Sequence, residues 1–211
     1  MVVIDKDSLI VSLHEIGAVQ FGDFKLKSGI ISPIYLDLRL LVSRPGTLRR
    51  VARMMQSMAS KLEFDREAAI PLAGLPIGVA FSLTTDIPII YHRIQAKQHG
   101  TGRFIEGTYN SGEKVLVLDD LISYGHSKLE TIELLEAVFL KVTDLMVIVD
   151  RQMGGEAVMK NKGYTLHHLL TMDEILDSLL DMKRISDERY RTVKAWLAEN
   201  QVKDEPQISK S

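Results

Sequence analysis

Apolar and polar residues alternate along the chain with two different periods. Apolar residues spaced three or four apart predict helices at residues 8–16, 48–62, 77–85, 127–138 and 156–162, and in two further segments between residues 172 and 200. Short apolar runs between these helices predict strands at residues 67–71, 87–92, 114–120, 144–150 and 164–170. The run at residues 114–120 is almost continuously apolar, as a strand buried on both faces requires.

Strands that alternate with helices indicate an α/β fold, in which a central, mostly parallel sheet is flanked by helices. Ligands of such sheets bind beyond the carboxyl ends of the strands. The 211 residues suit one domain, which we expect to span residues 1–200. The polar, aperiodic segment at residues 201–211 is expected to be a flexible tail.

The composition restricts the possible functions. Hydrophobic residues make up 45% and charged residues 26%, which is typical of soluble globular proteins. The formal net charge of −2 argues against a protein held to nucleic acid by its overall charge. Cysteine is absent, which excludes disulfides and thiolate chemistry and makes a cytoplasmic location natural. We expect no signal peptide, and no apolar run reaches the ~18 residues of a membrane span.

The segment VLVLDDLISYGHSK, residues 115–128, carries the strongest chemical signal. It places Asp119 and Asp120 at the end of the buried strand, followed by a short turn and a helix. Backbone N–H groups at a helix start are unpaired and can hold a phosphate. Like charges repel, so the two acids would instead accept hydrogen bonds from ribose hydroxyls. A phosphoribose site is therefore one interpretation.

The other interpretation of this segment is purely structural. Ser123 or Ser127 would cap the helix, and the acids would be a solvated strand end. The turn lacks the Gly-Lys-Ser/Thr of a P-loop, and it is not a dinucleotide fingerprint.

Residues 93–112 form the longest stretch without periodicity. The segment contains several glycines and the basic residues Arg93, Lys97, His99 and Arg103. Long irregular loops in compact domains are usually functional lids or disordered segments. A basic loop near a phosphate-type site favours a lid, and a solvated loop is the alternative.

The chain resembles the orotate phosphoribosyltransferase family, in the form found as the first domain of UMP synthase. The resemblance extends over residues 9–200. Its motifs are FGDFKLKSGIISPIYLDLR at 21–39, AKQHGTG at 96–102 with EGTY after it, VLVLDDLISYGHSKLETIELLE at 115–136 and VTDLMVIVDRQMGG at 142–155. It implies a type I phosphoribosyltransferase fold with a small N-terminal hood.

The resemblance also implies a reaction. Phosphoribosyl pyrophosphate (PRPP) and orotate would give orotidine 5′-monophosphate and pyrophosphate, with Mg2+ held mainly through PRPP and water. The family implies a homodimer whose lids reach the neighbour's site, and neither nucleic acid nor membrane is expected as a partner. Whether a decarboxylase associates with the chain stays open, and we expect none to be fused after residue 211.

Carried over by position, the resemblance assigns each motif a role. Catalytic roles fall to Lys97, His99 and Asp120. PRPP would be bound by Lys27, Arg93, Lys97, His99, Asp119, Asp120, Ser123, Tyr124, Gly125, His126 and Ser127. Orotate would be bound by Tyr35, Leu36, Ser123 and Arg151. An arginine suits a planar carboxylate because its guanidinium donates two parallel hydrogen bonds. Without the resemblance, Arg151 would also fit a structural salt bridge, and Lys27 a solvated lysine.

The chain departs from the family pattern at several positions. Ile94 stands where the lid usually has a lysine, and Leu72 and Ala73 stand where Tyr and Lys are frequent. Tyr124 and His126 are large in a turn that usually has small residues between its conserved positions. They would point away from the phosphate or crowd the base pocket, and a protonated His126 would add positive charge. These departures keep two alternatives open: a weakened PRPP-binding or regulatory protein, and a transferase for another base.

Overall fold

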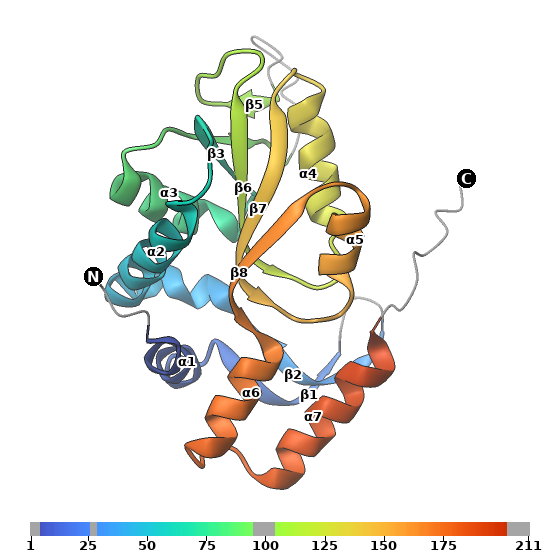
Figure 1. The fold of residues 1–211 in the computed structure, drawn as a ribbon. Coiled ribbons are helices and arrows are strands. Elements are labelled where there is room, and N and C mark those ends of the chain that lie inside the picture. The colour runs from blue at the N-terminus through green and yellow to red at the C-terminus, as the bar shows by residue number, and fades with distance from the viewer. Residues whose placement is uncertain (1–4, 26–28, 95–103, 202–211) are drawn as a thin grey trace.

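A sheet of six strands forms the centre of the fold, within residues 5–25, 29–94 and 104–201 that the computed structural model describes. The strands are β3 (Arg66–Ala69), β4 (Ile89–His92), β5 (Ile105–Glu106), β6 (Lys114–Ile122), β7 (Lys141–Asp150) and β8 (Thr165–Thr171). Their order across the sheet is β5-β4-β3-β6-β7-β8 (Figure 1). All neighbouring pairs from β4 to β8 are parallel, and β5 alone is antiparallel to its neighbour. This confirms the predicted mostly parallel sheet.

Helices cover both faces of this sheet. They are α1 (Lys6–Glu15), α2 (Pro45–Ala59), α3 (Gly74–Thr85), α4 (His126–Glu136), α5 (Gly155–Asn161), α6 (Met172–Asp181) and α7 (Asp187–Asn200), with a 3-10 helix η1 (Leu38–Ser43). Because side chains alternate along a strand, β6 contributes to two separate hydrophobic clusters. Leu116 and Leu118 pack in the cluster that contains Phe81 of α3. Val117 packs in the other cluster, with Ile132 of α4.

A small N-terminal hood lies beside the sheet. It is an antiparallel hairpin of β1 (Val19–Lys25) and β2 (Ile31–Leu36). In Figure 1 the hairpin lies next to α1, α6 and α7, so the two ends of the chain form one subassembly. The indole N–H of Trp196 in α7 donates to the carbonyl of Ile31 at 2.8 Å, which ties the last helix to the hood.

The helix starts follow from local chemistry. Asp5 caps α1 by accepting from the Ser8 N–H at 3.1 Å. Thr171 and Glu174 form a reciprocal capping box at the start of α6, which satisfies two otherwise unpaired backbone donors. Such caps explain why α6 begins directly after strand β8.

The predicted elements agree with the observed ones to within a few residues. Both closing helices are present, at α6 and α7. The periodicity missed three features: the strands of the hood, the 3-10 helix η1, and the two-residue strand β5 inside the segment predicted to be irregular. β5 is too short to show a period. Of the expected tail at residues 201–211, only Gln201 lies within the described part of the chain.

Candidate functional site

Two acids lie close to the end of the central strand β6, which continues to Ile122, and they differ in their surroundings. Asp119 is buried, and its Oδ1 accepts from the backbone N–H of Asp120 at 2.8 Å. Asp120 is partly exposed, and its Oδ1 accepts from the N–H of Leu121 at 2.7 Å. The pair lies at the carboxyl edge of the parallel sheet, where α/β folds bind ligands. This confirms the predicted position of the acids in the fold.

Lys128, in the first turn of α4, forms an ion pair with Asp119. Its Nζ lies 2.7 Å from Asp119 Oδ2, and the two side chains are 7% and 8% exposed. The motif analysis did not assign Lys128 a role. A signal was available, because Lys128 has the same helical phase as the buried Ile132 and Leu135. A lysine on an apolar stripe requires a buried acid as its partner.

Asp120 has a strongly perturbed pKa. Burial and the neighbouring charge of Asp119 raise the pKa of Asp120 to about 7, and the ammonium of Lys128 opposes this rise. Asp120 is therefore only partly ionised near neutral pH. A carboxyl group with a pKa in this range can accept hydrogen bonds from hydroxyl groups or exchange a proton during a reaction.

The turn after β6 has the geometry of an anion site. Gly125 adopts φ +90° at the N-cap of α4, in the left-handed region that favours glycine. A Cβ at this position would lie 2.7 Å from Cε of Met159, the flexible end of a side chain that would have to shift. The following residues His126 and Ser127 are exposed, and their backbone N–H groups start the helix. These features favour the binding of a phosphate at the turn.

The segment after β7 supports the turn from one side. The N–H of Gly155 donates to the carbonyl of Ser123 at 2.9 Å. A Cβ on Gly155 would lie 2.7 Å from that carbonyl oxygen, so only glycine permits this approach. On another side, a Cβ on Gly74 would meet Asp119 Oδ1 at 3.2 Å. Close backbone packing therefore fixes both the turn and the acid beside it.

Arg151 follows β7 and points toward the turn. Its Nη1 donates to Ser123 Oγ at 3.3 Å, while its Nε is buried without a hydrogen-bond partner in the described part of the chain. Burial lowers the pKa of Arg151, and Tyr124 partly opposes this effect. The structural salt bridge considered as an alternative is not found among the described residues. A half-satisfied guanidinium beside a phosphate turn is suited to bind an anion.

The two large residues of the turn take different directions. Tyr124 is half-buried against the larger hydrophobic cluster, and its hydroxyl donates to the carbonyl of Asn200 at 3.4 Å. His126 is exposed at the first position of α4. The two rings lie 6.4 Å apart, measured between their centroids. Of the two, Tyr124 lies on the side of Arg151, where a base would be bound.

The two hood residues expected to bind orotate, Tyr35 and Leu36, lie on opposite faces of β2. Tyr35 stacks on Phe24 with 5.4 Å between ring centroids, and its hydroxyl accepts from Arg39. Leu36 is buried in the larger hydrophobic cluster. Successive strand residues face opposite ways, so Tyr35 is the one with an outward-facing side chain. The joint assignment of both residues to a base pocket stays a prediction.

The structure describes only part of the expected lid. Arg93 is paired with Glu106 on β5, which joins the two ends of the irregular segment, and Ile94 is exposed. Lys97 and His99, and Lys27 of the hood, lie outside the described residues. Their assigned roles therefore stay predictions.

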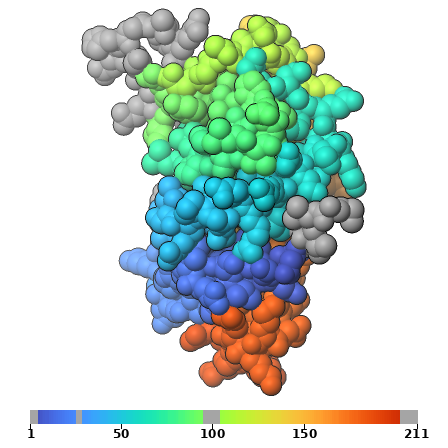
Figure 2. All heavy atoms as spheres, turned by 90° about the vertical axis from the view of Figure 1, so that its left-hand side faces the viewer, coloured from blue at the N-terminus to red at the C-terminus, as the bar shows by residue number. Residues whose placement is uncertain are grey.

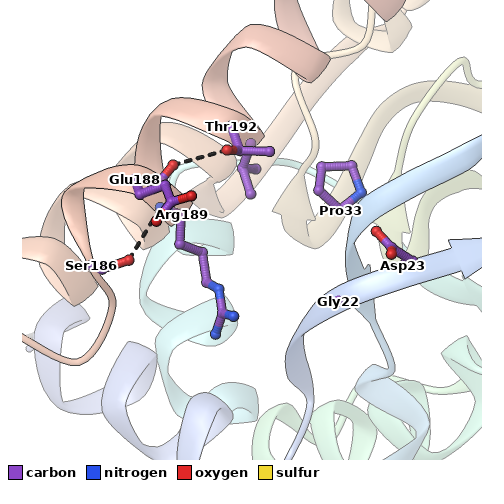
Figure 3. A pocket seen from close by; sticks show the side chains of 8 residues that line it. Gly22, Asp23, Pro33, Ser186, Glu188, Arg189 and Thr192 are labelled. Carbon is purple, nitrogen blue, oxygen red and sulfur yellow. Dashed lines mark hydrogen bonds between the residues drawn. The ribbon is translucent and has the colours of Figure 1, made fainter.

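A separate pocket of about 250 Å³ lies between the hood and α7 (Figure 3). It is lined by Gly22 and Asp23 of β1 and by Arg189 and Thr192 of α7, among others. In Figure 3 the Arg189 side chain extends from α7 into the space beside the hairpin. None of the residues that line it belongs to the acid pair, the turn or Arg151. We therefore assign the candidate site to the carboxyl edge of the sheet.

Comparisons with known proteins agree with this fold. Uridine 5′-monophosphate synthase of Bos taurus is 40% identical over 195 residues, which is 92% of this chain and 41% of that protein. Orotate phosphoribosyltransferase of Caenorhabditis elegans is 36% identical over 197 residues, covering 92% of this chain and 87% of that protein. The structure of Leishmania donovani UMP synthase aligns with a TM-score of 0.85 at 37% identity, over 92% of this chain and 42% of that one. No protein-family model matches the chain.

The sheet order, the acid pair and the glycine turn define a type I phosphoribosyltransferase. The alignment also covers 87% of the Caenorhabditis elegans orotate phosphoribosyltransferase, which narrows this class of transferases to one family. The chain belongs to the orotate phosphoribosyltransferase family. It spans about two fifths of the length of the UMP synthases that it matches, at 41% and 42%.

Proposed function

We propose that the chain transfers the phosphoribosyl group of PRPP to orotate, giving orotidine 5′-monophosphate and pyrophosphate for pyrimidine biosynthesis. One observation carries the proposal: the contact between Arg151 Nη1 and Ser123 Oγ at 3.3 Å joins a potential carboxylate-binding group to the phosphate turn. A substrate with a phosphoribosyl end and a carboxylate end requires these two features side by side. The relatives named above support the choice of orotate.

The roles of the residues follow from charge and geometry. The turn from Ser123 to Ser127 binds the 5′-phosphate through backbone N–H groups and hydroxyls. Asp120, with Asp119 behind it, accepts hydrogen bonds from the ribose hydroxyls. Arg151 binds the orotate carboxylate, and its desolvated position strengthens that interaction.

The reaction needs no protein nucleophile. A bond forms between a ring nitrogen of orotate and ribose C1, while the bond from C1 to the pyrophosphate oxygen breaks and its electron pair leaves with pyrophosphate. The nitrogen loses its proton to the surrounding base or solvent. Positive charge develops on the ribose and negative charge on the leaving group, so cations from Lys97, His99 and Arg93 stabilise the transition state more than the ground state.

Mg2+ is the proposed cofactor, and the residues at the site fit an ion held mainly by the substrate. Within the described residues no group of three or more His, Cys, Asp or Glu side chains is arranged to hold a metal. Mg2+ commonly keeps several waters and binds through substrate phosphates and one or two carboxylates. When bound, Mg2+ would offset the negative charge of the pyrophosphate.

The activity is tested by the decrease in orotate absorbance in the presence of PRPP and Mg2+. Turnover by the wild-type protein, and its loss in Arg151→Gln, would support the proposal. A folded protein without turnover on orotate or on a panel of other bases would contradict it. Turnover on another base alone would replace orotate with that base.

A second candidate is a PRPP-binding protein with weak or no catalysis. The observations that favour it are the exposed apolar side chains of Leu72 and Ile94, where family members often have polar or basic residues. An apolar side chain at either position provides no contact for pyrophosphate. Titration calorimetry with PRPP and Mg2+ separates the two candidates, because binding without turnover belongs only to the second.

We further propose a homodimer that uses the outer face of α3. The helix is apolar on all sides: Ile77 and Phe81 are buried, while Val79 and Leu83 are 49% and 80% exposed. A helix that is apolar all round is usually buried in the working form of a protein. Figure 2 shows the side of the molecule on which α2 and α3 lie. A second copy of the chain is the occupant that the family implies.

We propose a cytoplasmic protein without a nucleic acid or membrane partner. The absence of cysteine suits a reducing compartment, and the net charge of −2 offers no general attraction for a polyanion. Among the described helices, none is long and apolar enough to cross a bilayer. Cell fractionation with an antibody to the protein tests the location.

A further inference from the structure

The ion pair between Lys128 and Asp119 lies directly behind the surface that would contact ribose. Lys128 Nζ is 2.7 Å from Asp119 Oδ2 and 3.3 Å from Ser127 Oγ. One ammonium group therefore contacts both the acid pair and the phosphate turn. The lysine side chain is 7% exposed, so it is not a solvated surface charge.

The oxygens of the two acids are engaged differently. Asp119 Oδ1 accepts from the Asp120 N–H, and Asp119 Oδ2 is paired with Lys128. Asp120 Oδ1 accepts from the Leu121 N–H. Within the described part of the chain no hydrogen bond to Asp120 Oδ2 is found, so this oxygen can accept a bond from a ligand. The acids thus divide into a buried one that Lys128 holds and a partly exposed one.

A buried ion pair is an inefficient way to stabilise a fold. The cost of desolvating two charges offsets most of their attraction, and apolar residues of similar volume often do as well or better. The phase of Lys128 on α4 matches that of Ile132 and Leu135, where an apolar side chain would fit the helix pattern. The position of the pair beside the acids therefore indicates a role in the site.

We propose that Lys128 is a positioning residue, which anchors Asp119 against α4 so that Asp120 presents its free oxygen to a ribose hydroxyl. The identity of the ligand rests on the proposed function. The anchoring itself rests on the two distances and on burial, and it holds for any ligand with vicinal hydroxyls.

Removing the ammonium has a predictable electrostatic consequence. Asp119 raises the pKa of Asp120 and Lys128 lowers it, and these are the two charged groups that act on this carboxyl. The backbone of Gly74, at the start of α3, faces Asp119 without a side chain. Of the charged side chains on other adjoining elements, Arg39 of η1 pairs with Asp37, and Asp150 of β7 accepts from the Gln152 N–H. Glu67 of β3 is buried without a hydrogen-bond partner in the described part of the chain.

The test is a pH titration of the side-chain carboxyl carbons by NMR in the ligand-free protein. In Lys128→Met, we expect the acid pair to take up its first proton at a pH higher by about one unit or more. An unchanged midpoint would overturn the proposal. If the unpaired Asp119 prevents folding, the same comparison is made in an Asp119→Asn background. In that background, adding Lys128→Met should again raise the pH midpoint of the Asp120 titration. An unchanged midpoint would overturn the proposal.

Calorimetric titration with PRPP and Mg2+ gives a second readout. Lys128→Met should weaken binding about tenfold at pH 6.5 and much less at pH 8.5, because Asp120 must ionise to accept the hydroxyl bonds. Lys128→Arg, which keeps the charge, should retain most of the affinity. An equal loss at both pH values would indicate a merely structural lysine and contradict the proposal. If the wild type fails to bind PRPP, the proposed function fails, while the NMR titration still decides the role of Lys128.

Discussion

Arg151 and Ser123 lie 28 positions apart in the sequence, yet their side chains meet, with Nη1 of the arginine 3.3 Å from Oγ of the serine. The contact exists because β6 and β7 are adjacent parallel strands that end at the same edge, with Ile122 paired to Asp150. Each residue begins the segment that leaves its strand. The register of one strand pair therefore sets the distance between the phosphate turn and the base-binding group.

Replacing Arg151 should affect orotate far more than PRPP. Arg151→Gln removes a desolvated guanidinium, and loss of such a partner costs roughly 2–4 kcal/mol of binding. We expect the KM for orotate to rise by about two orders of magnitude, with PRPP affinity changed by less than about threefold. Steady-state kinetics and calorimetry measure the two effects. Arg151→Lys keeps the charge but not the paired donors, so it should recover only part of the loss. Equal losses of affinity for orotate and PRPP would contradict the assignment of Arg151 to orotate binding.

Gly125 should tolerate a side chain less well than Gly112, which provides a matched control. Both adopt a left-handed conformation, at φ +90° and +89°, but a Cβ on Gly112 meets nothing within 4 Å. Gly112→Ala should cost about 1 kcal/mol of folding free energy from backbone strain alone. Gly125→Ala also requires the Met159 side chain to shift, so it should cost about 2 kcal/mol, together with a loss of PRPP affinity. Urea unfolding and calorimetry check both. Similar behaviour of the two variants would show that the turn adapts.

Glu67 makes the stability of the protein depend on pH. Its side chain is fully buried on β3, and burial raises the pKa of Glu67 to about 9. Between about pH 4.5 and 9 the folded state thus binds more protons than the unfolded state. The contribution of protonated Glu67 to the stability is therefore complete at low pH and is lost as the pH rises. Relative to the wild type, the free energy of unfolding of Glu67→Gln should increase by on the order of 2–4 kcal/mol between pH 5 and 8. A difference in unfolding free energy that is constant with pH would contradict this.

The outer face of α3 should control the oligomeric state. Leu83→Glu places a charge in the proposed interface and should convert a dimer into a monomer. Phe139→Glu is the matched control, because Phe139 is 74% exposed against 80% for Leu83 but lies after α4. Sedimentation equilibrium of the two variants measures the effect. Dissociation by both variants, or by neither, would remove α3 from the interface.

Lys97→Ala should depress kcat far more than substrate binding. The reason is that a cation on the leaving group stabilises the transition state, where the negative charge is largest. Stopped-flow kinetics with PRPP, combined with calorimetry, separates the two effects. An unchanged kcat would remove the role assigned to this lysine.

The fold was predictable because its signals are local. The continuous apolar run of β6 marks a strand covered on both faces, and the apolar spacing of α4 marks a helix, without knowledge of any neighbour. Asp119 and Asp120 were predictable for the same reason: they end a strand that precedes a helix. β5 was missed because two residues carry no period, and its strand conformation depends on pairing with β4.

The site was predictable only in part. Sequence placed the acids, Gly125 and Arg151 in the correct segments, but it left the directions of Tyr124 and His126 undecided. In the structure Tyr124 packs toward the end of α7 at Asn200, which is 76 positions away in the chain. His126 faces solvent because it occupies the outward side of the first turn of α4.

The sequence by itself determined the order of the elements and the acid–turn–helix segment, because periodicity and turn chemistry act over a few residues. Only the tertiary structure decided that Lys128 pairs with Asp119 and that Asp120 keeps a free oxygen. Those relationships depend on how α4 packs against β6, and a charge buried at that contact has to find its partner across space. The segment predicted from its sequence to bind phosphoribose thus contains a lysine whose importance only the packing of α4 reveals.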